Sequence, residues 1–300
     1  MSPRITKLAA TLAIGLALAL PALAQPQPTT NLPTESTESN ALEAVYLAWP
    51  PEDPDPVPWV RTTLQDGRRE VLYDSGGDLL SIAVQRQDSG RTLVAWPRAA
   101  GNGYDVVLSR FEAGSWSEPV VVAGTSADER DPALAVAPDG TVHVLYSVAG
   151  EPPRVYHRQA PPDLSSWSDP VAVSGPKEPA AGARAVFHGG ILHAVYEVDD
   201  FGFGSAPKRI VVARLTPGGF VAETVATTSN EGPVRPEIHA EGGRLWVEWI
   251  DAPGEIAWTI EGAGERFGAL RYEGFDSAIE REIFARGKIR YEATAGQAGR

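Results

Sequence analysis

Four arginines occupy similar places in successive segments of the sequence and could together hold an anion. They are Arg130 in ERDPALAV, Arg184 in GARAVF, Arg235 in VRPEIH and Arg281 in EREIF. Counted back from the turn glycines at 140, 190, 243 and 287, they lie 10, 6, 8 and 6 positions away, all even. Even spacing along a strand places side chains on one face. Arginines from several strands could then bind a carboxylate or sulfate in bidentate fashion.

Acidic residues accompany these arginines and leave two interpretations open. Asp131 and Glu237 join the arginines as candidate ligand-binding residues, and Asp128 is close to them in sequence. The acids could pair with the arginines, which would then be salt-bridge partners on the rim of an acidic protein. A carboxyl group whose pKa is raised could instead serve as a general acid.

Metal and cofactor sites are not expected. The chain has no cysteine, which excludes disulfides, thiolate ligands and a cysteine nucleophile. His143 and His193 stand at equivalent places in successive segments, which favours a structural role, and two imidazoles such as His188 and His193 make a poor metal site. No phosphate-binding loop, nucleophile elbow or H-E-x-x-H motif is present.

The segments that carry the arginines repeat about every 50 residues. A strand-like stretch ending in an aromatic residue recurs as RTLVAWP, TVHVLYS, ILHAVYE and RLWVEWI. Its aromatics are separated by 50, 50 and 53 positions, and an earlier copy, AVYLAWP, ends 47 positions before the first. We predict that these residues pack in the core. They are Trp49, Trp96, Tyr146, Tyr196 and Trp249.

One complete repeat predicts four short antiparallel strands. They cover DPALAVA, TVHVLYSV, PRVYHRQ and DPVAVSG, with an Asp139-Gly140 turn between the first two. Four strands in about 50 residues are typical of a β-propeller blade. The sequence therefore predicts an all-β fold, a β-propeller of five to six four-stranded blades over residues 42–293. We expect the strands at the two ends of this domain to share a blade.

A second repeat, GSWSEPVVVAG and SSWSDPVAVSG, resembles a known motif. In Asp-box repeats a hairpin turn reads roughly Ser-x-Asp-x-Gly-x-Thr-Trp. The segment PPDLSSWSDPV keeps Trp167, Ser166 and, one position off, Asp163, whereas FEAGSWSEPV keeps Ser115 and Trp116 without the acid. The chain thus resembles the BNR/Asp-box, sialidase-like β-propeller family over about residues 42–292, with degenerate boxes.

The resemblance implies the architecture, and catalytic residues have to be sought separately. Catalytic sialidases of this family use an arginine triad, an aspartate acid/base and a tyrosine nucleophile, and their first arginine lies in a Phe/Tyr-Arg-Ile-Pro motif. That motif is missing here, since Lys208-Arg209-Ile210 lacks the aromatic and the proline. We therefore predict a non-catalytic binding or scaffold protein for a glycan or protein ligand, possibly an anionic one. The alternative is an exo-sialidase-type glycoside hydrolase with a rearranged site. There Arg130, Arg184 and Arg235 would hold a carboxylate, and Asp128, Asp131 or Glu237 would supply the acid.

The N-terminus and the charge indicate an exported protein. Residues 1–24 carry Arg4, Lys7, an apolar run and small residues before Ala24, as a signal peptide does. Residues 25–41 are expected to be a disordered tail, and residues 294–300 form a C-terminal tail after the domain. The net charge of −13 argues against nucleic acid, and no later stretch predicts membrane insertion. We expect a secreted or periplasmic monomer.

Cleavage of the signal peptide can be checked directly. We expect the exported protein to begin at Gln25, because the small residues Ala22 and Ala24 precede that bond. Mass spectrometry of the secreted or periplasmic protein measures its N-terminus. A protein that retains residues 1–24 in the membrane fraction would contradict this assignment.

Overall fold

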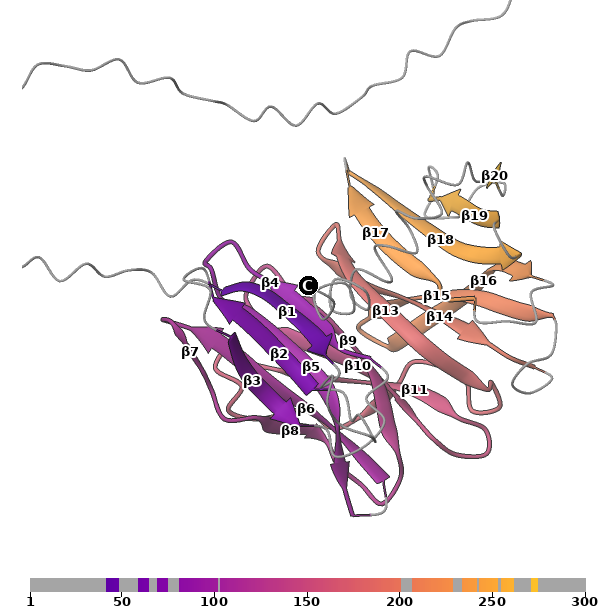
Figure 1. Ribbon diagram of the computed structural model, residues 1–300. Helices are drawn as coiled ribbons and strands as arrows, with labels where there is room; N and C mark the ends of the chain where they lie inside the picture. Colours follow the sequence, from indigo (N-terminus) through magenta and orange to yellow (C-terminus); the bar gives the residue numbers. More distant parts are fainter. Residues whose placement is uncertain are drawn as a thin grey trace, which may run out of the picture. The chain divides into compact units, whose positions relative to one another are not determined.

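The computed structural model describes ten ranges of the chain, all within one compact unit, Ser39–Arg300. The ranges are 42–48, 59–64, 69–74, 81–101, 103–200, 207–228, 234–241, 243–252, 255–261 and 271–274. Every regular element in these ranges is a β-strand, and the strands form antiparallel sheets (Figure 1). In this part of the chain no helix is long and apolar enough to cross a membrane. The predicted all-β class is confirmed. Trp49, the signal peptide, both predicted tails and residues 275–293 of the predicted propeller lie outside the described residues.

Each sheet is built from strands that follow one another in the chain. The first two sheets contain β1 (Leu42–Ala48), β2 (Trp59–Leu64) and β3 (Arg69–Asp74), then β4 (Ala83–Arg86), β5 (Thr92–Ala100), β6 (Gly103–Glu112), β7 (Ser115–Trp116) and β8 (Val120–Ala123). The next two contain β9 (Glu129–Val136), β10 (Val142–Val148), β11 (Arg154–Ala160) and β12 (Val171–Ala172), then β13 (Ala180–His188), β14 (Ile191–Val198), β15 (Lys208–Thr216) and β16 (Gly219–Thr228). The last contains β17 (Glu237–Glu241), β18 (Arg244–Ala252), β19 (Glu255–Ile260) and β20 (Arg271–Gly274).

The predicted four-strand repeat is confirmed in β9–β12, whose order in the sheet is β12-β11-β10-β9. The turn between β9 and β10 uses Gly140 at a φ of 87°, where glycine carries no steric penalty. Asp139 supports this turn, because its Oδ1 accepts a hydrogen bond from the backbone N–H of Thr141 at 2.9 Å. The alternation of side chains in β10 then supplies apolar residues to both faces of the sheet.

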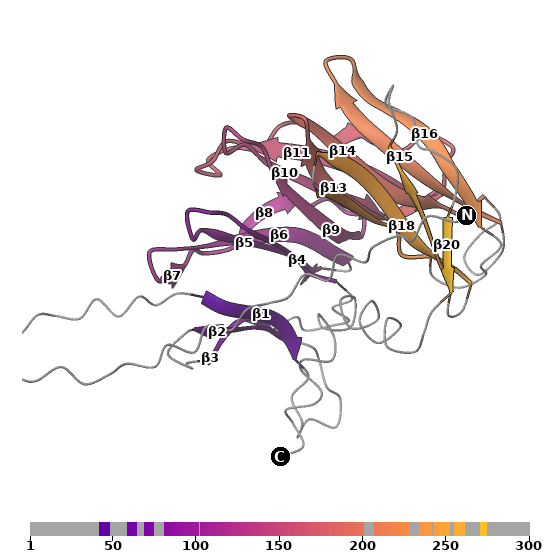
Figure 2. The ribbon, with the colours of Figure 1, turned by 90° about the horizontal axis from the view of Figure 1, so that it is seen from above.

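Successive sheets pack face to face through these apolar side chains (Figure 2). Tyr146 lies in a core shared by the β4–β8 and β9–β12 sheets, whereas its neighbour Leu145 lies in the core shared with β13–β16. Tyr196 and Trp249 repeat the role of Tyr146 in the next two sheets. Full burial of such a side chain contributes about 1.5–3 kcal/mol. The prediction that the recurring aromatics pack in the core is confirmed for Trp96, Tyr146, Tyr196 and Trp249.

The SWSEP and SWSDP repeats form equivalent turns. Ser117 and Ser168 each exchange hydrogen bonds with the strand opposite. The backbone N–H of Arg110 donates to Ser117 Oγ, and that of Gln159 donates to Ser168 Oγ, both at 3.0 Å. Each hydroxyl also donates to the next backbone carbonyl at 3.1 Å. Trp116 and Trp167 are partly buried and pack against the core beside these turns.

Two histidines of the β9–β12 sheet form a buried pair that the sequence did not predict. His143 Nδ1 and His157 Nε2 are 2.9 Å apart, and the two rings are stacked. Phe187 and Phe220, from the next sheet, contact them edge-on. Burial lowers the pKa of His143 to about 4 and that of His157 to about 3.

These lowered pKa values predict a loss of stability in mild acid. Below its ordinary pKa of about 6.5, each imidazole gains a proton in the unfolded chain but stays neutral in the folded one. The free energy of unfolding should therefore fall as the pH drops from about 6.5 to about 4. Urea unfolding across this range measures the slope, and His157→Phe should reduce it. An equal slope in the variant and the parent protein would contradict this assignment.

Candidate functional site

A bulge interrupts β9 and β13, and a similar irregularity directly precedes β17, each time opposite the recurring aromatic. Asp131 and Pro132 together oppose Tyr146, because Arg130 pairs with Ser147 and Ala133 pairs with Leu145. In the next sheet two residues, beginning at Gly182, oppose Tyr196 in the same way. In the last sheet the pairs Val234–Ile250 and Glu237–Glu248 leave two residues opposite Trp249. The first bulged residue has a positive φ each time, at Asp131, Gly182 and Arg235 (50°, 66° and 46°).

The bulge changes the predicted arrangement of the arginines. Arg130 precedes the bulge, Arg235 is its first residue and Arg184 is the first residue after it. The period-two alternation on which the even spacing relied is interrupted here, because two residues of the bulged strand oppose one on its partner. Arg281 lies outside the described residues.

Two of the arginines contact acids. Arg184 Nε lies 3.1 Å from Glu237 Oε1, which joins equivalent positions of neighbouring sheets. Arg130 Nη2 lies 3.1 Å from Asp128 Oδ2, and its guanidinium covers the Tyr104 ring at 4.3 Å from the centroid.

The other two candidates do not share these contacts. Asp131 Oδ1 accepts a hydrogen bond from Ser81 Oγ at 3.2 Å, and Arg235 is exposed. The structure thus brings together Arg184 and Glu237, and it supports the salt-bridge interpretation for Arg130 and Arg184.

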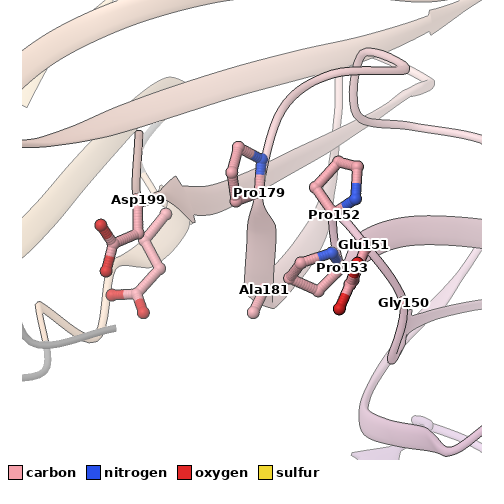
Figure 3. A pocket seen from close by; sticks show the side chains of 8 residues that line it. Gly150, Glu151, Pro152, Pro153, Pro179, Ala181 and Asp199 are labelled. Atoms are coloured by element: carbon pink, nitrogen blue, oxygen red, sulfur yellow. The ribbon is translucent and has the colours of Figure 1, made fainter. Parts of the chain in front are cut away.

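A pocket of about 310 Å³ lies beside the bulge of β13 (Figure 3). Ala181, immediately before Gly182, forms part of its wall, and Glu197 and Asp199 enter from the end of β14. In the view of Figure 3, Pro179 lies between Asp199 and the pair Pro152 and Pro153. The remaining wall comes from Gly150 and Glu151.

Hydrogen bonds between backbone groups fix the pocket wall. The N–H of Ala180 donates to the carbonyl of Pro153 at 3.0 Å, and the N–H of Asp199 donates to the carbonyl of Pro179 at 2.9 Å. The rings of Pro152, Pro153 and Pro179 restrict φ at three further positions. The pocket is therefore preformed, and a ligand would enter without ordering these segments.

Glu197 has a perturbed environment. Burial raises its pKa, and the negative charges of Asp199 and Asp131 add to that effect, against the opposing effect of Lys208 and a backbone hydrogen bond. The bond is donated to Glu197 Oε2 by the N–H of Val234, at 3.3 Å. A carboxyl group with a raised pKa can accept hydrogen bonds when ionised and donate one when protonated.

Arg209 ties together the segments on either side of the pocket. Its Nε and Nη2 donate to the two carboxylate oxygens of Asp200, at 2.7 and 2.9 Å, and its Nη1 donates to Glu178 Oε1 at 3.2 Å. Glu178 and Asp200 are the chain neighbours of the lining residues Pro179 and Asp199. The guanidinium holds the pKa of the Asp200 carboxyl below its usual value.

Sequence reasoning missed Glu197 and Asp199 as a pair. The available signal was two acids two positions apart at the end of a predicted apolar strand, where period-two alternation places them on one face. Within the described ranges, no group of three or more histidine, aspartate or glutamate side chains is arranged to hold a metal ion.

Comparisons with known proteins bear on the fold. No protein-family model and no curated protein matches the sequence. Solved structures do match: the Hadza microbial sialidase Hz136 has a TM-score of 0.51 at 13% identity, over 73% of this chain and 54% of that one. The fold is sialidase-like. An ulvan lyase of polysaccharide lyase family PL25 has a TM-score of 0.52 at 12% identity, over 71% and 60% of the two chains. The intramolecular trans-sialidase from Ruminococcus gnavus has a TM-score of 0.51 at 10% identity, over 65% and 70%. This chain spans about half the length of Hz136.

The Arg209 contacts predict a stabilising role. Arg209→Gln leaves Asp200 and Glu178 without their cation, so the free energy of unfolding should fall by about 1–3 kcal/mol. Lys177→Gln removes the same charge from an exposed site nearby and should change the free energy of unfolding by less than about 0.5 kcal/mol. Urea unfolding of both variants measures the difference. Equal stabilities would show that the ion pairs contribute nothing.

Proposed function

We propose that the protein is an exported, non-catalytic glycan-binding protein built on a sialidase-like β-propeller of five to six blades. In this proposal the terminal strands close the ring in a shared blade, and the mature protein is a secreted or periplasmic monomer. Likeness in fold to structures described as sialidases and a lyase supports a carbohydrate ligand. The binding site we propose is the pocket between Pro152 and Asp199.

The observation that carries this proposal is the preformed pocket itself. Its volume of about 310 Å³ is at the lower end of the ligand-site range of about 300–1,000 Å³, which suits one sugar ring. An apolar wall with a few convergent polar groups is the usual composition of a small-molecule site. The sequence-predicted candidates lie at or next to the bulges of the first strands. We propose that they contact further units of a longer glycan; they are Arg130, Asp131, Arg184, Arg235 and Glu237.

A second candidate function is glycoside hydrolysis. The raised pKa of Glu197, with Asp199 beside it in the same pocket, favours this alternative, because a protonated carboxyl group can donate a proton to a leaving oxygen. Glu197 would then replace Asp128, Asp131 or Glu237 as the acid. Fluorogenic glycosides, sialosides included, test this directly. Turnover that is abolished by Glu197→Gln would establish hydrolysis, and no turnover would leave binding as the function.

Filling the pocket tests glycan binding. Ala181→Leu places a larger side chain in the pocket wall and should weaken glycan binding at least tenfold, because a sugar ring would no longer fit in the pocket. Ala222→Leu makes the same change on an exposed part of β16 and should leave affinity unchanged. A glycan microarray identifies ligands, and calorimetry compares the variants. The absence of glycan binding by the parent protein would overturn the proposal.

A further inference from the structure

The charge of the pocket wall points to a particular class of sugar. We infer that the pocket takes a terminal sugar that donates hydrogen bonds, either a neutral hexose or a protonated amino sugar, and that it rejects acidic sugars. This inference rests on the proposed function, because it concerns the same pocket. It departs from the anionic ligand that the arginine pattern in the sequence suggested.

The polar side chains of the wall are all acidic. Glu151, Glu197 and Asp199 line the pocket, and no lysine, arginine or histidine is among the described lining residues. Ionised carboxylates accept hydrogen bonds, as Glu197 does unless it is protonated, so ligand groups that donate hydrogen bonds suit this wall. Hydroxyl and ammonium groups do so, whereas a ligand carboxylate or sulfate would add a like charge in a partly buried space.

Two arginines beside the bulges are paired with the protein's own acids. Arg130 and Arg184 are each 3.1 Å from a carboxylate, so an acidic ligand would have to displace Asp128 or Glu237. Lys208 is buried, and its positive charge lowers the pKa of Glu197, so it balances part of the negative charge of the wall. Arg235 is exposed and is not part of the wall.

The rest of the wall suits the apolar face of a sugar ring. The side chains of Pro152, Pro153, Pro179 and Ala181 contain carbon atoms only, and backbone hydrogen bonds hold Pro153 and Pro179 in place. A ring that lies against the prolines can direct its hydroxyl or ammonium groups toward Glu197 and Asp199. The sugar then contacts the prolines and the acidic side chains at the same time, and such polar contacts usually fix the orientation of a ligand in its site.

Calorimetry with four probes tests the inference. The probes are a neutral hexose oligomer, a de-N-acetylated hexosamine oligomer, a sialylated oligosaccharide and a uronic acid oligomer. We expect binding of the neutral probe, the amino probe or both, with affinity for the two acidic probes at least tenfold weaker. Tighter binding of an acidic probe that is lost in Arg235→Ala overturns the inference and leaves glycan binding standing. Failure of all four probes, together with a blank microarray, overturns the proposed function instead.

Variants of the wall distinguish the two kinds of donor. Asp199→Asn removes a charge but keeps an acceptor, so amino-sugar binding should fall more than tenfold and neutral-sugar binding only a few-fold. Glu151→Gln makes the same change at an exposed position of the wall and replaces Asp199→Asn in the test if that variant does not fold. Asp169→Asn, at an exposed site outside the wall, is the control and should leave affinity unchanged. Unchanged affinity in Asp199→Asn and Glu151→Gln would overturn the inference, because the ligand would then bind elsewhere.

Discussion

The structure depends on apolar packing between the faces of successive sheets. A four-stranded sheet of this length has two apolar faces, and water would remain on at least one of them in isolation. The alternation in β10 shows the solution, since Tyr146 and Leu145 fill cores on opposite sides of the same sheet. The recurring aromatics hold equivalent positions in these cores, so the spacing of the repeat follows from the packing.

The sequence predicted the parts of the fold that repeat locally. The Asp139-Gly140 turn and the period-two alternation of its flanking strands specify a hairpin, and the structure has it. The arrangement of the arginines was not predictable in this way. A bulge depends on how two residues meet one aromatic on the partner strand, and Asp131 and Arg235 adopt a positive φ that their residue types do not announce. The contact between Arg184 and Glu237 spans two sheets, so no local pattern contains it.

Several arginines of the described residues are paired with carboxylates outside the pocket, whereas the charged side chains that line the pocket are acidic. Arg130, Arg184 and Arg209 each contact carboxylates in this way. The Arg209 contacts lie outside the pocket but join the chain neighbours of its lining residues. Ion pairs therefore support the segments around the pocket, whereas the carboxylates of the pocket wall provide hydrogen-bond acceptors.

The bulges opposite Tyr146 and Tyr196 each separate two stretches of the same strand, and the irregularity opposite Trp249 has the same place. Between the bulge and the hairpin turn, the alternation of side chains must match the core, because a shift by one residue would expose apolar side chains. Before the bulge, Ala180 and Val234 are again fully buried in the cores, although the alternation has shifted by one residue. Gene duplication of such a unit would copy the bulge together with the packing on both sides of it. The residue at the bulge itself could then change between copies, as Asp131, Gly182 and Arg235 differ here, while the core beside it is kept.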